Sequence, residues 1–147
     1  MLKRSALLVV VALAIVVSAC ENPKTAVGMT LDENGHPVAV IKPCHADATI
    51  FAVSIKRFSD NSLVWEITSD TGTRQRSFPI GEVPRGFNEV VAYTPRPLQG
   101  DVQVDFKTSE LPHDAANIDL AKLQRGTVLL NGKQVTMTAF DSRNTCG

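Results

Sequence analysis

The side chains best suited to metal or acid–base chemistry gather near residue 45 of the sequence. His45 and Asp47 are two residues apart, beside Cys44, so both would point to one face if this stretch formed a strand. His113 could add a third ligand from a distant loop, and zinc accepts imidazole together with carboxylate oxygen. Solvated loop side chains are the ordinary alternative. The sequence therefore predicts no metal site, with His45, Asp47 and His113 kept as candidates.

The motifs that mark common enzymes do not occur in this sequence. It has no Gly-x-Ser-x-Gly nucleophile elbow, no glycine-rich phosphate loop and no His-Glu-x-x-His. Glu66 and Asp105 could form a glycosidase pair, but both fall at outward positions of predicted strands, where a solvated charge is ordinary. We expect no catalytic residues, no cofactor and no enzyme activity. An enzyme or metal-handling protein using His45, Asp47 and His113 is the alternative.

The first twenty residues differ in composition from the rest. Lys3 and Arg4 form a short basic start, and residues 5–19 are an uncharged run rich in Leu, Val, Ile and Ala. A membrane-spanning helix needs about 20 apolar residues, so this shorter run predicts a secretory signal peptide. The whole chain is neutral, with 15 Lys and Arg against 15 Asp and Glu. This balance argues against nucleic acid as a partner.

The end of the apolar run resembles the lipobox of bacterial lipoproteins. Val17, Ser18, Ala19 and Cys20 provide an aliphatic residue, two small residues and a cysteine, although leucine is usual in place of Val17. The resemblance implies cleavage before Cys20, a diacylglyceryl thioether on its sulfur, and acylation (palmitate, for example) of the new α-amino group. Two or more acyl chains anchor a protein stably to a membrane.

This resemblance divides the chain into three parts. It implies a signal peptide over residues 1–19 and a lipidated tether over residues 20–26, followed by one domain over residues 27–147. The domain would sit in the cell envelope, with membrane lipid as its partner through acylated Cys20. Glu21 does not decide between the outer face of the cytoplasmic membrane and the outer membrane.

If Cys20 carries lipid, Cys44 and Cys146 remain as an even pair in an oxidising compartment. Such a pair predicts a disulfide, with a redox or metal pair as the alternative. No Cys-x-x-Cys spacing supports that alternative. A bond that closes about 100 residues stabilises a fold by up to ~4.7 kcal/mol in the chain-entropy model. It would also hold the C-terminal tail against the domain.

Residues 27–147 show the patterns of an all-β domain. Apolar and polar residues alternate in ways that predict strands at 27–31, 38–41, 49–55, 63–68, 76–80, 90–93, 102–107, 127–130 and 135–139. One short helical turn is expected at 119–124, with Asp119 as its cap. Trp65 should lie in the core with Leu63 and Ile67. The regular turn spacing predicts an antiparallel sandwich or a barrel.

Two turns define the expected register. Asn131 and Gly132 separate two strand patterns and predict a two-residue type I′ hairpin. Its apolar row, Val135, Met137 and Ala139, should pack against the sheet that carries Trp65. Residues 70–72 are expected to link two strands.

The order of Cys44, Trp65 and Cys146 resembles the Cys…Trp…Cys order of immunoglobulin domains. The sequence departs from that pattern at Asn144, where a tyrosine would precede the second cysteine. The resemblance implies an immunoglobulin-like sandwich and no particular function.

These observations favour a lipid-anchored binding or scaffolding domain, with an envelope protein or a glycan as its candidate partner. A second alternative is an inhibitor or protector of an envelope enzyme, docking through the loop at residues 83–88. The basic clusters Lys56-Arg57 and Arg74-Gln-Arg76 are expected to be solvated.

Cys20→Ala should leave the protein unacylated and its signal peptide uncut by the lipoprotein peptidase, because the thiol that accepts the lipid is missing. Mass spectrometry of the mature N-terminus tests this. A free, unmodified N-terminus at any other residue of the parent protein would show that Cys20 is not the anchor.

Overall fold

The computed structural model describes residues 25–94 and 98–146, which form an all-β fold with one short α-helix. In chain order the elements are β1 (Ala26–Leu31), β2 (Pro37–Lys42), β3 (Ile50–Arg57), β4 (Leu63–Thr73), β5 (Ser77–Pro79), β6 (Asn88–Val91), β7 (Asp101–Thr108), β8 (Asp114–Asp119), the 3-10 turn η1 (Leu120–Lys122), β9 (Thr127–Leu130), β10 (Lys133–Thr136) and α1 (Met137–Asp141).

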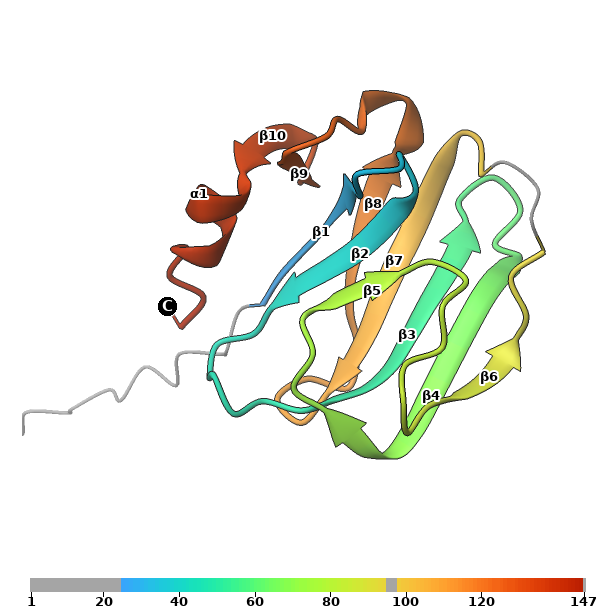
Figure 1. Ribbon diagram of the computed structural model, residues 1–147, viewed down its shortest axis with the longest axis vertical. Coiled ribbons are helices and arrows are strands. Elements are labelled where there is room, and N and C mark those ends of the chain that lie inside the picture. The colour runs from blue at the N-terminus through green and yellow to red at the C-terminus, as the bar shows by residue number, and fades with distance from the viewer. Residues whose placement is uncertain (1–24, 95–97, 147) are drawn as a thin grey trace, which may run out of the picture.

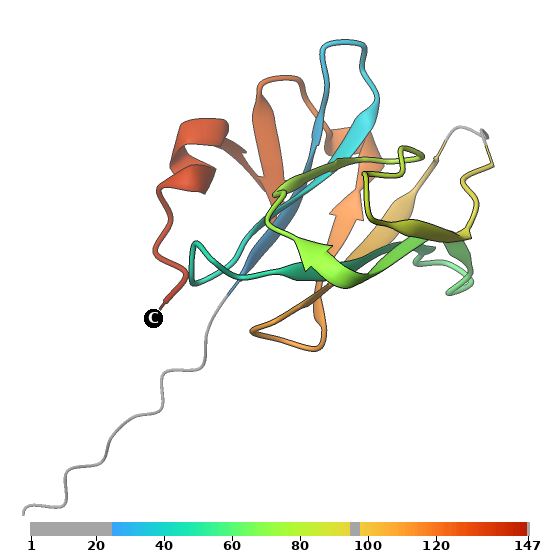
Figure 2. The ribbon, with the colours of Figure 1, turned by 60° about the horizontal axis from the view of Figure 1, so that its bottom comes forward.

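The strands form two antiparallel five-stranded sheets. Sheet A has the order β10-β9-β1-β2-β5, and sheet B has the order β6-β4-β3-β7-β8. In Figure 1 the strands β1 and β2 pass in front of β8, and β5 crosses in front of β7; Figure 2 shows the same layers turned by 60°. The predicted antiparallel sandwich is therefore confirmed.

Side chains from the inner faces of both sheets form the main core. Trp65 and Ile67 of β4 are fully buried there, as the alternation predicts. Leu63 is 40% exposed instead, because a β-bulge shifts the register between Ile55 and Lys56 and pairs Leu63 with Lys56. An extra residue in a strand turns the following side chains to the other face. The expected place of Leu63 in the core is thus wrong.

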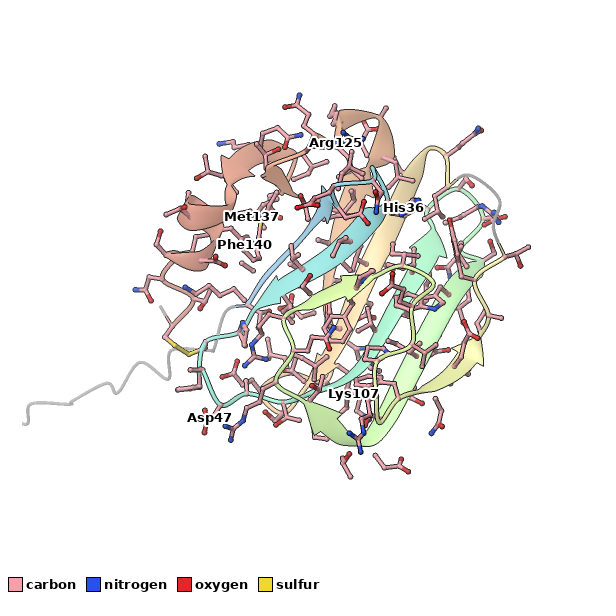
Figure 3. The ribbon with its side chains drawn as sticks, viewed as in Figure 1. His36, Asp47, Lys107, Arg125, Met137 and Phe140 are labelled. Carbon is pink, nitrogen blue, oxygen red and sulfur yellow. A yellow bond between two sulfur atoms is a disulfide. The ribbon has the colours of Figure 1, made fainter. Side chains whose placement is uncertain are left out.

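Sheet A is buried on its outer face as well. Ala39 and Ile41 of β2 point into the main core, whereas Val38 and Val40 belong to a second apolar cluster. That cluster also contains Phe140 of α1, and Figure 3 shows Met137 and Phe140 on the side of the helix that faces the sheet. The uninterrupted apolar run of β2 therefore reflects burial on both faces.

Most of the other predicted strands are present, with differences at several strand ends and one additional strand. The strand β1 begins at Ala26, inside the predicted tether, whose residues 20–24 lie outside the described residues. The strand β8 was not predicted, because its sequence DAANID buries only Ala116 and Ile118 as apolar side chains. Asp119 caps η1 as expected, since its Oδ1 accepts a hydrogen bond from the Ala121 N–H, but η1 is shorter than 119–124.

The pattern predicts that residues 70–72 link two strands. In the structure they lie within β4 instead, so this prediction is wrong. Gly72 has a φ of 70°, and its N–H donates to Ser69 Oγ at 2.9 Å. Pairing with β3 resumes beyond this point, where Thr73 lies opposite Ile50. The positive φ therefore produces a bulge within a continuing strand.

The hairpin between β9 and β10 has the predicted turn. Asn131 and Gly132 have φ values of 50° and 75°, and the flanking residues Leu130 and Lys133 are paired. A type I′ turn requires positive φ at both central residues. The turn prediction is confirmed.

The strand predicted at 135–139 ends early, at Thr136. Thr136 caps α1, because its Oγ1 accepts a hydrogen bond from the Ala139 N–H at 3.1 Å. Val135 packs on the second cluster, while Met137 and Ala139 are exposed. The expected packing of this row against the sheet of Trp65 is wrong, since the chain turns into a helix that buries Phe140 on sheet A.

Gly132→Val should lower the free energy of unfolding by roughly 1–2 kcal/mol, because a β-branched side chain is strained at positive φ. A Cβ at this position would meet no atom within 4 Å, so the backbone conformation alone is tested. Gly132→Asn is the matched control, since asparagine tolerates this region. Thermal melts of both variants check the turn. A Gly132→Val melt like that of the parent would contradict it.

Candidate functional site

A hollow lies on the outer face of sheet A, between α1 and the loop that follows β2. It has a volume of about 610 Å³ and is lined by Val40, Lys42, His45, Arg76, Met137 and Phe140, among others. This volume is within the range of small-molecule pockets, ~300–1,000 Å³. We call it the α1 groove.

The helix α1 forms the apolar wall of the α1 groove. Phe140 is 2% exposed and packs on Val40, whereas Met137 is 38% exposed. Sequence analysis missed Phe140. The signal that could have located it is a threonine at a helix N-cap, Thr136, followed by Met137 and Phe140 at a spacing of three.

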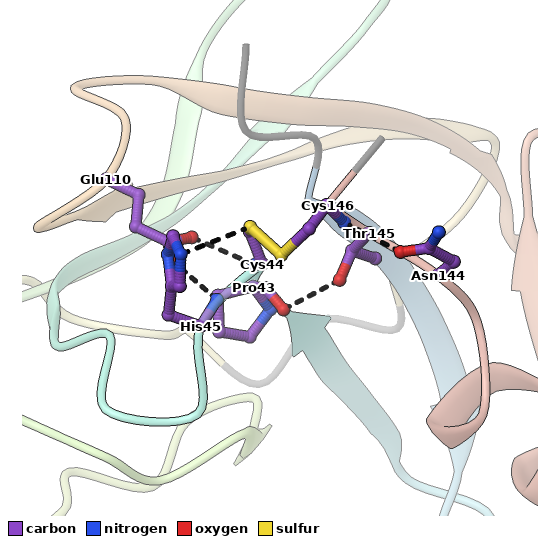
Figure 4. The surroundings of a disulfide bond; sticks show 7 residues. All are labelled: Pro43, Cys44, His45, Glu110, Asn144, Thr145 and Cys146. Carbon is purple, nitrogen blue, oxygen red and sulfur yellow. Dashed lines mark hydrogen bonds and ion pairs between the residues drawn. A yellow bond between two sulfur atoms is a disulfide. The ribbon is translucent and has the colours of Figure 1, made fainter. Parts of the chain in front are cut away.

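A disulfide closes one end of the α1 groove. Cys44 and Cys146 are bonded, with their Cα atoms 4.8 Å apart, and Thr145 Oγ1 donates to the Pro43 carbonyl at 2.8 Å (Figure 4). The predicted bond is therefore present. It joins the loop after β2 to the tail after α1, outside the core that contains Trp65, and so ties the two walls of the groove together.

Glu110 holds the loop beside the disulfide. Its Oε2 accepts a hydrogen bond from the Cys44 N–H at 2.9 Å, and its Oε1 accepts one from the His45 N–H at 2.7 Å. The same Oε1 lies 2.6 Å from His45 Nδ1 (Figure 4). The Glu110 side chain is only 9% exposed. Nothing in the sequence marks Glu110, because its partners are 65 and 66 residues away.

The three candidate metal ligands do not converge. His45 and Asp47 lie in a loop and not in a strand, and both are exposed. Among the described residues, the one group of three ligand types within reach of each other is Cys44, His45 and Cys146. Its two cysteines are bonded to each other, so neither is available as a thiolate ligand.

Asp105, one of the carboxylates considered for catalysis, lies on the outer face of sheet B. Register places Ser54 of β3 between Glu66 of β4 and Asp105 of β7, and these residues border a polar hollow of about 310 Å³. Asp105 Oδ2 lies 3.3 Å from Nδ1 of the exposed His113. The Asp105 side chain is 19% exposed, and its Oδ1 is buried without a hydrogen-bond partner. The expectation of a fully solvated charge at Asp105 is thus wrong.

Asp114 is the titratable group with the most perturbed environment on this sheet. Burial and then the nearby charge of Asp105 raise the pKa of Asp114 to about 6, and its Oδ2 is buried without a partner. Both effects disfavour the charged carboxylate. A carboxyl group whose pKa is higher in the folded state than in the unfolded chain is expected to make stability depend on pH.

The predicted docking loop at residues 83–88 is partly anchored. Phe87 is 7% exposed, and its ring lies edge-on to Phe78 with centroids 6.0 Å apart. Val83 is 43% exposed and presents the apolar side chain of this loop to solvent. Of the second basic cluster, Arg74 is exposed as expected, but Arg76 is half-buried beside the α1 groove.

Asp114→Asn should make stability less dependent on pH. In the parent, the folded state binds more protons than the unfolded chain between roughly pH 4 and pH 6, so stability falls as pH rises through this window. The variant should lose this slope and melt at a higher temperature than the parent at pH 7. Thermal melts across this pH range test it. Asp101→Asn, an exposed carboxylate on β7, is the matched control. Equal slopes for parent and Asp114→Asn would contradict the assignment.

Comparison of the chain with known proteins finds no relative. Among the described residues, no helix is long and apolar enough to cross a membrane, and residues 1–20 are not among them. No family model matches the chain, and neither a curated protein nor a solved structure matches it.

Proposed function

We propose that this protein is a lipid-anchored bacterial envelope protein whose β-sandwich binds a small apolar ligand in the α1 groove. The observation that carries the proposal is the groove itself, about 610 Å³ in volume with Val40, Met137 and Phe140 on its apolar surface. Ligand sites are concave, largely apolar and supplied with a few polar groups. Lys42, His45 and Arg76 supply those groups here.

The walls of the groove are held in place without a ligand. The disulfide joins them, Glu110 fixes the backbone of Cys44 and His45, and Lys42 Nζ donates to the Asp141 carbonyl at the end of α1. A site that is already formed loses less conformational entropy on binding. This rigidity supports a binding role over a purely structural one.

The lipid anchor supports a ligand drawn from the membrane. Ala26 pairs with Lys42 in the register of β1 and β2, so the start of the domain lies beside the groove. Cys20 precedes Ala26 by six residues, which span at most about 22 Å when extended. Acylation of Cys20 would therefore keep the groove close to the lipid surface.

The alternatives have less support. A metal-handling role required His45, Asp47 and His113 to converge, and they do not. An inhibitory role for residues 83–88 rests on the exposed Val83 alone.

Met137→Glu should weaken binding of a neutral apolar probe such as N-phenyl-1-naphthylamine by about tenfold or more, because it places a charge where the probe would cover an apolar side chain. Fluorescence titration of the mature chain, residues 20–147 with Cys20→Ser and the disulfide formed, measures this. Glutamate is well placed near the start of a helix, so α1 should persist.

Val83→Glu is the matched control, since Val83 is 43% exposed and Met137 is 38% exposed. It introduces the same charge outside the groove and should bind the probe as the parent does. Absence of probe binding to the parent, or equal affinity for parent and Met137→Glu, would contradict the proposed function.

A further inference from the structure

Arg76 is the groove residue whose hydrogen bonding is incomplete. Its Nη2 donates to the Ala46 carbonyl at 2.8 Å, and its backbone carbonyl accepts from the Ile41 N–H at 3.0 Å. These bonds hold the side chain and its backbone against the groove. Nη1 is buried and has no hydrogen-bond partner. Buried polar atoms are nearly always paired, so an unpaired guanidinium nitrogen in a pocket requires an explanation.

The carboxylates nearest to Arg76 do not neutralise it. Glu110 and Asp47 lie close enough to act on its charge, but neither forms an ion pair with it within 4 Å among the described residues. Both oxygens of Glu110 are already bound to the backbone N–H groups of Cys44 and His45. Burial lowers the pKa of Arg76, yet arginine keeps its proton in proteins. The groove therefore carries the positive charge of Arg76, and no carboxylate among the described residues lies within 4 Å of its guanidinium.

Lys42 adds a second positive charge to the groove. Lys42 and His45 also line it, at the end that the disulfide closes. Asp141 is the one acidic residue in the lining, and its carbonyl oxygen is the acceptor for Lys42 Nζ. The α1 groove thus combines an apolar surface on Val40, Met137 and Phe140 with a basic side formed by arginine.

We propose that the α1 groove binds an amphiphile with an apolar chain and a single carboxylate head, and that the guanidinium group of Arg76 pairs with this head. This rests on the proposed function, because it specifies the ligand of the same groove. The planar guanidinium matches a carboxylate better than any other common anion-binding side chain. A neutral head would form no ion pair with the guanidinium, and a cationic head would be repelled by it.

A series of ligands that differ only in the head tests the proposal on the unmutated mature chain. Dodecanoate, dodecanol and dodecyltrimethylammonium, each below its micelle concentration, compete with N-phenyl-1-naphthylamine for the groove. Dodecanoate should displace the probe at a concentration at least about tenfold lower than dodecanol, and the cation should be the weakest. Equal displacement by dodecanoate and dodecanol would overturn the proposal.

Arg76→Gln should remove the preference for dodecanoate and leave the affinity for dodecanol unchanged. Arg74→Gln is the matched control, because it removes the same charge from the same connection between β4 and β5 at an exposed side chain outside the groove. It should keep the preference. Equal loss in the two variants would assign the effect to net charge and overturn the role of Arg76.

The outcomes separate the two proposals. If the probe and dodecanol bind but the head makes no difference, the inference about Arg76 fails and the apolar groove stands. If neither the probe nor any of the three amphiphiles binds, both fail. A thermal melt of Arg76→Gln shows whether it folds, and the series on the parent chain tests the carboxylate preference whether or not this variant folds.

Discussion

The bond between Cys44 and Cys146 is the constraint on which the α1 groove depends. The helix α1 has only five residues, too few to be stable alone in water. It is held at one end by the β9–β10 hairpin and at the other by a tail that the disulfide fastens to the loop after β2. The bond closes 102 residues, and a loop of that order contributes up to ~4.7 kcal/mol in the chain-entropy model. A wall that is covalently fixed at its far end can face solvent and keep its position.

Two charged side chains, Glu110 and Arg76, lie near the disulfide at this end of the molecule. Glu110 is mostly buried, but backbone N–H groups of the disulfide loop satisfy its oxygens. Arg76 lies across the groove with one nitrogen unsatisfied. Because the Glu110 oxygens are bound to the backbone and Arg76 has no acidic partner within 4 Å among the described residues, the proposed ligand has an anionic head. The two unpaired carboxylate oxygens of Asp105 and Asp114 lie on sheet B instead, where burial raises the pKa of Asp114 to about 6.

Sheet A differs from sheet B because it is covered on both faces. Its outer apolar cluster, with Val38, Val40 and Phe140, is small and depends on α1 for cover. Sheet B turns a polar outer face to solvent, where Lys56, Glu66 and Lys107 border a shallow hollow. Val40 and Phe140 of this second cluster form the apolar floor of the α1 groove. The proposed function follows from this asymmetry.

The sequence by itself determined the all-β class, the places of most strands, the type I′ turn at Asn131 and Gly132, and the pairing of Cys44 with Cys146, because alternation, turn chemistry and cysteine number are local or countable properties. Only the tertiary structure decided which side chains line the α1 groove and surround it. Glu110 and Arg76 meet the loop after β2 across long stretches of chain, and no short-range pattern encodes such contacts. The apolar alternation of residues 135–139 predicted a strand, but Thr136 could also cap a helix, and the outer face of sheet A decided in favour of the helix by accepting Phe140.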